Sequence, residues 1–521
     1  LLEKNCIYLC ELNESLNLGI SEITYPLIFR SQSGNSSDTR ILYSGVIPYT
    51  LLLENSTNIS FENLSIHRSG GSKNIDIISS QNIIFNNCNI QNNSSVGNSG
   101  VVYSININGS DSITIENSYV SSYNQANWSG THAYALDISN SYVIDIYGST
   151  LHTSSVYGRV TNLQISNSEF INLYDNTLTS DANTNDDYGG WRKLIVSNST
   201  SDIMMFNNIF SYTGGYDCNS KHLELNSTEN VEIQNNSFLN SKGDALSLNI
   251  VNGLVNNNYF STSHTVPVGT ALSMSGKNIT LTDFNFTSSY TGNGIYISAD
   301  SSTVSSNRIT SIYNGIGINI SGNANFLYNN YVYGEGELDN PLFKNSGSTN
   351  QIYYNTIRYY NENFDATSWE ELNSNSTLAM NNLIVNEGNG SVIKMNSLSN
   401  HIFDYNNYYS STSNLGFVES TYANNMFDLQ SLTLGNTNSI SENPYFTNIE
   451  DFTPNTGLLN GAGTPIQGIE FDINQNYRDT ILPDIGAVEY DYYELLGCTN
   501  ELACNYDAST TTDHVDSLCV F

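Results

Sequence analysis

Apolar and polar residues alternate along this chain in short runs that end in the same way, at a polar pair rich in Asn followed by an apolar anchor. Two clear copies are ISFENLSI (59–66) and VEIQNNSF (231–238). An apolar residue at every second position predicts β-strands, whose side chains point alternately to the two sides. Further copies lie at residues 83–90, 113–120, 163–170, 203–210, 253–260 and 279–286, and looser ones at 304–309, 327–332, 352–357 and 379–384.

The distance between successive anchors gives the length of the repeating unit. Most gaps are about 20 to 30 residues long, which is within the range of known structural repeats. No stretch keeps a helical period, and strand-built units of this length are typical of one turn of a β-solenoid rather than of a propeller blade. We therefore predict an all-β parallel solenoid of about thirteen or more turns, stacked ~4.8 Å apart. The anchors are Ile66, Ile90, Val120, Leu151, Phe170, Phe210, Phe238, Phe260, Phe286, Ile309, Val332, Ile357 and Ile384.

The Asn residues of the repeated polar pair have a structural explanation. Asn tolerates left-handed backbone dihedral angles and hydrogen-bonds to neighbouring backbone groups, which suits a tight corner between strands. Stacked amide side chains also hydrogen-bond to one another along a rod. We expect these Asn residues to be scaffold rather than a binding site.

The charge of the chain excludes two classes of partner. With 16 Lys and Arg against 50 Asp and Glu, the formal net charge is −34, so the surface repels nucleic acids and anionic membranes. No stretch approaches the roughly 18 apolar residues of a membrane span. The chain begins at Leu1 without a basic and apolar leader, and we expect a mature or excised chain.

The seven cysteines are distributed unevenly. Cys88 and Cys218 are isolated and are expected to be free thiols. The other five lie near the two ends, where disulfides among them would suit an oxidising, extracellular location. These five are Cys6, Cys10, Cys498, Cys504 and Cys519.

The widest gap between anchors, from Phe170 to Phe210, marks a first candidate site. It contains DANTNDDYGGWRK (181–193), in which carboxylates stand beside a Trp and two basic residues. Such a set suits Ca²⁺ or stacking against a sugar ring, although Gly and Asp are equally what a long surface turn requires. The candidate ligand-binding residues are Asp186, Asp187, Tyr188, Trp191, Arg192 and Lys193.

A column of lysines is the second candidate site. Lys193 and Lys221 precede their anchors by the same number of positions, and Lys242 lies one position farther from its own. If no insertion intervenes, the three side chains stack on neighbouring turns, with Arg192 and His222 alongside. Such a column would bind an acidic polysaccharide through its positive charges.

Two alternatives apply to the same column. In a lyase, its cations would supply the base and the electrophile for β-elimination, with Ca²⁺ acidifying the uronate α-proton. In a scaffold, each lysine would only begin the exposed part of a turn, with carboxylates such as Glu224 and Asp244 offsetting the repulsion between lysines. The catalytic set of the first alternative is Lys193, Lys221, Lys242 and Arg192.

Residues from about 20 to 410 resemble the right-handed parallel β-helix repeats of secreted bacterial proteins. The segments 23–41 and 49–66 are similar to the first turns of surface β-helix proteins from Bacteroidetes. The segments 404–417, 443–463 and PDIGAVEY (483–490) resemble the region that closes such helices. The resemblance implies an N-terminal cap at 1–22, a β-helix at 23–410 and a closing region at 411–490.

The tail GCTNELACNYDASTTTDHVDSLC (497–519) resembles a short Cys/Asp module of extracellular proteins from marine Bacteroidetes, so we expect 491–521 to form a separate module. The module usually ends in Asp-Asp-Gly-Ser-Cys, and residues 515–519 depart from that ending. The resemblance implies either a Ca²⁺ site at Asp507, Asp513 and Asp516 or a spacer pinned by disulfides. Proteins of these families are typically exported by type IX secretion and act at the cell surface.

Two functions follow from these patterns. The first is a non-catalytic, secreted surface module, an adhesin or extracellular fibre, which binds glycans or other copies of the chain through polar, Tyr-rich faces. The second is a Ca²⁺-dependent polysaccharide lyase or a glycoside hydrolase acting on an acidic polysaccharide. An enzyme would need a groove with an acid/base group of shifted pKa, and the fold by itself supports either class.

Overall fold

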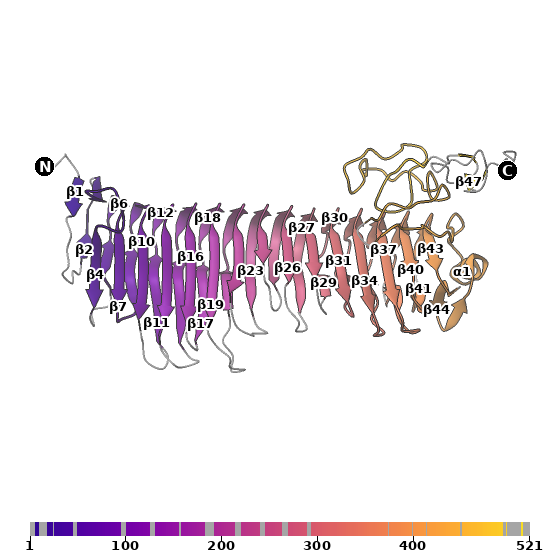
Figure 1. Cartoon of the computed structure of the whole chain (residues 1–521), viewed down its shortest axis with the longest axis horizontal. Coiled ribbons are helices and arrows are strands. Elements are labelled where there is room, and N and C mark those ends of the chain that lie inside the picture. Colours follow the sequence, from indigo (N-terminus) through magenta and orange to yellow (C-terminus); the bar gives the residue numbers. More distant parts are fainter. Residues whose placement is uncertain are drawn as a thin grey trace.

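The chain folds as an elongated rod of stacked parallel strands (Figure 1). The strand pairing confirms the prediction of an all-β solenoid, to which one short helix is added. The computed structural model describes residues 6–9, 18–23, 26–44, 49–94, 100–125, 131–155, 158–182, 192–213, 220–239, 245–262, 269–288, 293–372, 375–398, 400–412, 414–448, 451–492, 496–497 and 512–513.

Most turns contribute three strands, and in three middle turns the first two run on as one long strand. One turn consists of β8 (Lys73–Ile78), β9 (Gln81–Asn86) and β10 (Asn89–Ser94). Each of these strands pairs in parallel with its equivalent in the next turn, as Ile90 does with Val120. The rod therefore has a first, a second and a third sheet, in the order of the strands in a turn. The first corner of a turn joins its first and second strands, the second corner joins its second and third strands, and a loop leads to the next turn.

The strands of the three sheets have the following bounds. The first sheet comprises β2 (Leu18–Ser21), β5 (Leu51–Glu54), β8, β11 (Val101–Asn108), β14 (His132–Ser139), β17 (Arg159–Ser166), β20 (Arg192–Asn198), β23 (Lys221–Gln234), β25 (Leu246–Asn256), β27 (Thr270–Thr282), β29 (Asn293–Ile297), β32 (Ile318–Ile320), β35 (Phe343–Asn345), β38 (Thr367–Glu371), β41 (Ser391–Met395) and β44 (Gly416–Val418). The second comprises β1 (Cys6–Leu9), β3 (Leu27–Ser31), β6 (Thr57–Glu62), β9, β12 (Asp111–Glu116), β15 (Tyr142–Tyr147), β18 (Glu169–Tyr174), β21 (Ser201–Phe206), the later parts of β23, β25 and β27, and then β30 (Thr303–Ser305), β33 (Phe326–Tyr328), β36 (Gln351–Tyr353), β39 (Leu378–Met380) and β42 (Ile402–Asp404). The third comprises β4 (Arg40–Ser44), β7 (Ser65–Ser69), β10, β13 (Tyr119–Asn124), β16 (Thr150–Ser155), β19 (Thr177–Ala182), β22 (Ile209–Thr213), β24 (Ser237–Leu239), β26 (Tyr259–Thr262), β28 (Asn285–Ser288), β31 (Arg308–Tyr313), β34 (Tyr331–Gly336), β37 (Thr356–Asn361), β40 (Leu383–Asn386) and β43 (Asn407–Ser410).

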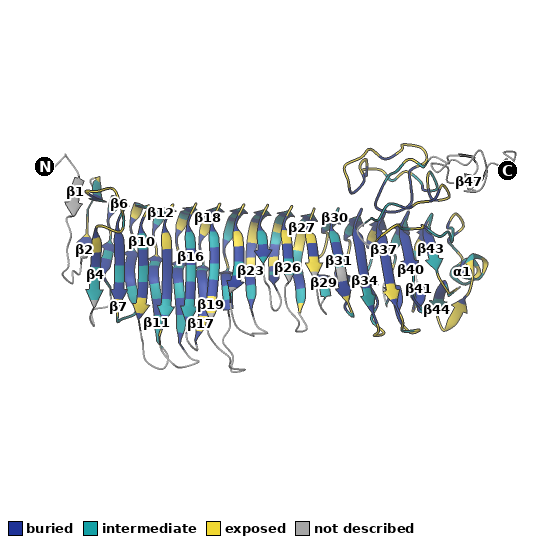
Figure 2. Cartoon of the chain, viewed as in Figure 1, coloured by how far each residue is buried: buried dark blue, intermediate teal, exposed yellow. Residues whose placement is uncertain are grey.

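Alternate residues of each strand point into a continuous apolar core (Figure 2). Ile113 and Ile115 of β12 are fully buried, whereas the alternating Glu116 is partly exposed, as predicted. Anchors of successive turns stack on one another, and the ring centroids of Phe210 and Phe238 are 4.7 Å apart. Each buried side chain of this size contributes ~2 kcal/mol, so the stabilisation by the core grows with the number of turns.

One predicted anchor is wrong. The residue that stacks between Leu151 and Phe210 is Leu178 of β19, not Phe170. Phe170 lies in β18 of the second sheet, where it is partly exposed and has a φ of 57°. The pattern is ambiguous because the first corner also contains a polar pair, here at Asn167, which has the same sequence pattern as the polar pair of the second corner. With Leu178 as the anchor, the gap before Phe210 is similar in length to the longer gaps elsewhere in the chain. The length of this interval is therefore no longer a reason to expect a binding site there.

The second corner explains the repeated Asn pair. Its first residue has a left-handed conformation, as at Asn87, where φ is 51°. Its second residue is buried, and its amide hydrogen-bonds from turn to turn: Nδ2 of Asn208 donates to Oδ1 of Asn236, and Nδ2 of Asn236 donates to Oδ1 of Asn258, both at 3.0 Å. The interpretation of these residues as scaffold is confirmed. A second buried ladder runs through Asn307, Asn330, Asn355, Asn382 and Asn406.

A hairpin and a helix end the solenoid on its C-terminal side. Strand β44 pairs antiparallel with β45 (Thr421–Ala423), and α1 (Met426–Thr433) lies beside them at the end of the rod (Figure 1). The Asn425 side chain caps the helix by accepting a hydrogen bond from the N–H of Asp428 at 2.9 Å. In the described part of the chain, no helix is long and apolar enough to cross a membrane.

Residues 441–448 and 451–492 then fold back over the second corner and the third sheet of the last turns, as a largely irregular segment that we call the strap (Figure 1). Phe452 of the strap stacks on Tyr331, with ring centroids 4.4 Å apart. The buried guanidinium of Arg478 lies 3.9 Å from the ring centroid of Tyr354. Residues of the predicted closing region therefore form both an end cap and a strap along the side of the rod.

Candidate functional site

Lys193 and Lys221 are direct neighbours on the first sheet. They are partners in the parallel register of β20 and β23. Oε2 of Glu224 lies 2.7 Å from Nζ of Lys193 and 3.6 Å from Nζ of Lys221. The predicted stacking of these two lysines, offset by Glu224, is confirmed, while Lys242 and Asp244 lie outside the described residues.

Glu224 stays ionised in this environment. Partial burial would raise its pKa, but the short ion pair with Lys193 and the charge of Lys221 outweigh burial and lower the pKa. The cluster therefore carries one net positive charge at neutral pH.

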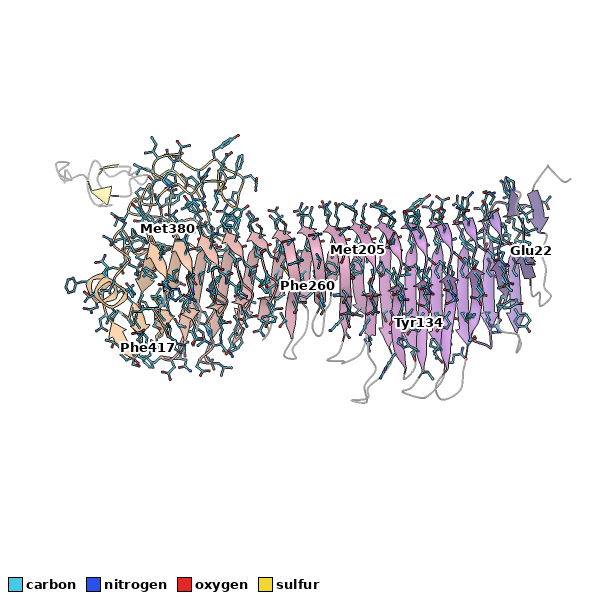
Figure 3. The ribbon with its side chains drawn as sticks, turned by 180° about the vertical axis from the view of Figure 1, so that it is seen from behind. Glu22, Tyr134, Met205, Phe260, Met380 and Phe417 are labelled. Carbon is cyan, nitrogen blue, oxygen red and sulfur yellow. The ribbon has the colours of Figure 1, made fainter. Side chains whose placement is uncertain are left out.

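The lysine column continues into stacked tyrosines. Going back from Lys193, the register runs through Thr161 and Tyr134, and then through Tyr103 to Lys73. The ring centroids of Tyr103 and Tyr134 are 5.2 Å apart and their planes differ by 10°. Figure 3 shows Tyr134 on the lower part of the rod in that view. The column thus forms an aromatic surface with a lysine at either end.

His132 supports Tyr134 from the side. Its Nδ1 lies 3.2 Å from the Tyr134 hydroxyl and its Nε2 lies 3.1 Å from the Thr161 hydroxyl. Burial, together with the charges of Arg159 and Lys193, lowers the pKa of His132 to about 4. Burial also raises the pKa of Tyr134. At neutral pH the pair is therefore a neutral imidazole and a protonated phenol.

A second column of polar residues borders the first. Nζ of Lys73 lies 3.0 Å from Oδ2 of Asp76, and Nδ2 of Asn106 donates to Oδ1 of Asp76 at 2.6 Å. Burial raises the pKa of Asp137 to about 6, although Lys73 opposes the shift, so the charge at the centre of the surface changes near that pH. We call the whole surface the tyrosine–lysine face, formed by Lys73, Tyr103, His132, Tyr134, Arg159, Lys193 and Lys221 together with the carboxylates Asp76, Asp137 and Glu224.

The sequence contained a signal for the tyrosines of the column, which counting from the lysines alone did not predict. Tyr103 and Tyr134 each precede the anchor of their turn by the same number of positions as Lys193 and Lys221 do. Lys73 keeps the same distance from its anchor, and Thr161 does so once Leu178 replaces Phe170. Searching for that distance from every anchor would have found the column.

The structure corrects the placement of Arg192 and His222. Both side chains are buried, with exposed fractions of 1% and 0%. Each is adjacent in sequence to a lysine of the column, and adjacent residues of a strand point to opposite sides of the sheet. His222 lies inside the solenoid, where burial lowers its pKa to about 3 and Nε2 lies 3.1 Å from the carbonyl oxygen of Leu239. Neither residue reaches a ligand bound on the tyrosine–lysine face.

Several predicted residues lie wholly or partly outside the described residues. For Cys6 and for Asp513, in β47 (Thr512–Asp513) beside β46 (Leu496–Gly497), only the backbone is described. Within the described ranges, no group of three or more His, Cys, Asp or Glu side chains is placed to hold a metal ion. The residues wholly outside are Asp186, Asp187, Tyr188, Trp191, Asp507, Asp516, Cys10, Cys218, Cys498, Cys504 and Cys519.

The prediction of a free thiol at Cys88 is confirmed. The side chain is buried, and burial raises the pKa of the thiol to about 12. Its Sγ lies 3.3 Å from the carbonyl oxygen of Phe61 in the previous turn. Cys88 is therefore an inert core residue rather than a reactive group.

Comparison with known proteins leaves the function open. No protein-family model and no curated protein matches the chain. Among solved structures, it is similar to PfbA, a surface adhesin of Streptococcus pneumoniae, with 11% sequence identity and a TM-score of 0.23, covering 71% of this chain and 84% of that one. It is also similar to the tailspike protein of E. coli bacteriophage HK620, a mutant in complex with a pentasaccharide, with 10% identity and a TM-score of 0.21, covering 76% of this chain and 72% of that one. Similarity this weak carries no argument about function.

Proposed function

We propose that this chain is a non-catalytic β-solenoid module of a secreted surface protein, an adhesin or an extracellular fibre, and that it binds an acidic polysaccharide through the tyrosine–lysine face. The observation that carries the proposal is the register that places stacked tyrosines between lysines, with Lys193 and Lys221 side by side. The face holds four of the sixteen Lys and Arg residues against three carboxylates, Asp76, Asp137 and Glu224, in a chain whose net charge is −34.

The chemistry of the face suits a chain of uronic acids. Phenol rings such as that of Tyr134 offer apolar area to a sugar ring and a hydroxyl to its polar edge. Lysines attract carboxylates, and a repeating ligand engages several turns at once, which raises the overall affinity. The surface location rests on the motif resemblances of residues 483–490 and 497–519, and other copies of the chain are the alternative partner.

Retention on immobilised alginate, pectate and chondroitin sulfate tests the proposal. The variant Lys193→Gln/Lys221→Gln should reduce the affinity about tenfold, and added salt should weaken the wild type in the same way. The single variant Lys221→Gln keeps the 2.7 Å ion pair between Lys193 and Glu224 and controls for folding.

The matched control is Lys277→Gln/Lys344→Gln, which removes two charges elsewhere on the rod and leaves Glu370 its 2.9 Å ion pair with Lys394. Retention of the control should equal that of the wild type. Equal retention of the tyrosine–lysine variant and the control would remove this face from the binding site.

One observation favours a lyase as the second candidate. A neutral His132 within 3.2 Å of the Tyr134 hydroxyl is an acid/base pair of the kind that moves a proton. Incubation with uronate polysaccharides, with and without Ca²⁺, should give no unsaturated product by ultraviolet absorbance if the module is non-catalytic. A signal that is lost in Tyr134→Phe would make the protein an enzyme. A signal only with Ca²⁺ would support a Ca²⁺ site, for which Asp507, Asp513 and Asp516 are the proposed ligands.

A further inference from the structure

A cavity of about 390 Å³ opens at the second corner of the middle turns, away from the tyrosine–lysine face. It lies where β25, β27 and β30 pass into β26, β28 and β31, next to the edge of the strap. Its polar lining consists of Asn256, Asn257, Asp283, Asn285, Ser306 and Arg308.

The cavity coincides with a break in a surface ladder of amides. The left-handed residues of the second corner form this ladder, in which Nδ2 of Asn257 donates to Oδ1 of Asn235 at 2.7 Å, as Nδ2 of Asn87 does to Oδ1 of Asn63 at 2.6 Å. The next left-handed residue is Asp283. A carboxylate has no N–H to donate to Oδ1 of Asn257. The ladder therefore stops at Asn257, and Oδ2 of Asp283 accepts a hydrogen bond from the Thr282 hydroxyl of its own turn at 3.1 Å.

Two further polar atoms of the lining lack a partner. Oδ1 of Asn256 and Nε of Arg308 are buried and have no hydrogen-bond partner among the described residues. Both atoms are shielded from solvent, so a ligand in the cavity would contact the exposed polar groups of the lining rather than these two atoms. The exposed amides of Asn257 and Asn285 and the carboxylate of Asp283 still offer the cavity both donors and acceptors.

Aromatic residues lie next to residues that line the cavity, on the third sheet and on the strap. On the third sheet, Tyr259 is in register with Asn285 and then with Arg308, and its side chain is 42% exposed. On the strap, the rings of Phe471 and Tyr477 lie 4.6 Å apart.

Arg308 and Asn329 attach this part of the strap to the rod. Nη2 of Arg308 donates to Oδ1 of Asn474 at 2.7 Å, and Nδ2 of Asn329 donates to the carbonyl oxygen of Phe471 at 2.6 Å. Asn329 is the left-handed residue of the turn after Ser306. The strap therefore forms a step immediately beside the cavity.

We propose that this cavity binds one ring of a neutral oligosaccharide. Sugar hydroxyls both donate and accept hydrogen bonds, so a single ring can pair with Asn257, Asp283 and Asn285 while its apolar face stacks on Tyr259. The volume falls within the range of small-ligand pockets. Asp283 and Arg308 balance each other in charge, which favours an uncharged ligand over the acidic polysaccharide proposed for the other face.

Calorimetric titration of the full chain with cellohexaose, maltohexaose and xylohexaose tests this site. At least one should bind with one-to-one stoichiometry. Asp283→Asn should weaken that binding at least about tenfold and raise the melting temperature, because the new Nδ2 can donate to Oδ1 of Asn257 and extends the amide ladder by one turn. Tyr259→Ala should also weaken it by removing the stacking surface.

Tyr119→Ala is the matched control, because Tyr119 is also exposed, at 38%, and faces outward at the equivalent position of β13, several turns away. It should leave binding unchanged. Lys193→Gln/Lys221→Gln should do the same, which separates this site from the tyrosine–lysine face. The proposal is overturned if none of the three hexaoses binds at millimolar concentration, or if folded Asp283→Asn and Tyr259→Ala bind as the wild type does.

Discussion

Two clusters of two lysines and one glutamate stand on the first sheet, and they arrange the same charges differently. In one cluster, Lys344, Glu370 and Lys394 follow one another in register on β35, β38 and β41. Oε2 of Glu370 lies 3.5 Å from Lys344 and Oε1 lies 2.9 Å from Lys394. Each lysine there faces a carboxylate in its own column and has a carboxylate oxygen to itself.

In the other cluster, Lys193 and Lys221 face each other in register, and both address the same oxygen of Glu224. Like charges on neighbouring strands repel, and one shared oxygen offsets this only in part. An incoming anion relieves the repulsion. The comparison teaches that register, rather than composition, separates a scaffold cluster from a candidate binding site.

The largest expected effect is on stability, at Glu370. The side chain is nearly buried and holds two ion pairs, so Glu370→Gln should lower the free energy of unfolding by about 2 kcal/mol. Urea denaturation measures the loss. Retention on acidic polysaccharide should not change, and a variant as stable as the wild type would contradict the scaffold role.

A smaller effect is expected at Glu224. Glu224→Gln should destabilise the fold by about 1 kcal/mol or less because the site is partly exposed. It should also tighten the binding of acidic polysaccharide about threefold, since Lys193 and Lys221 lose their shared counter-charge. Affinity measured by calorimetry checks this, and weaker binding would show that Glu224 itself contacts the ligand.

The smallest effect concerns pH and Asp137. Its folded-state pKa of about 6 exceeds that of an unfolded Asp. The protonated carboxyl therefore stabilises the fold fully below about pH 4, and this contribution is lost as the pH rises through 6. Relative to Asp137→Asn, the wild type should lose stability between pH 4 and 7.

The affinity for acidic polysaccharide should also change with the protonation of Asp137. The wild type should bind acidic polysaccharide about twofold more tightly at pH 5 than at pH 7, because protonation removes a negative charge from the face. Asp137→Asn should bind equally at both values. An identical pH profile for variant and wild type would assign the dependence to another group.

Much of the fold was predictable because it depends on local patterns repeated many times. The period of two, the anchor spacing and the Asn pair predicted the strands, the stacking and the corners. The anchor was predicted wrongly at Phe170, because the first corner has the same polar pattern as the second. No sequence pattern predicted the helix α1. For the candidate site, counting from the anchors found the pairing of Lys193 with Lys221, but it did not find Tyr134 or His132.

The sequence by itself determined that this protein is a rod of stacked turns, because each turn repeats the same alternation and the same corner chemistry. Only the tertiary structure decided which side of the sheet each residue faces and what lies beside it. Arg192 is buried although Lys193 is exposed, since one position along a strand reverses the side. The strap covers Tyr331, and Asp283 interrupts the amide ladder, because these contacts join residues far apart in the chain that no local pattern connects.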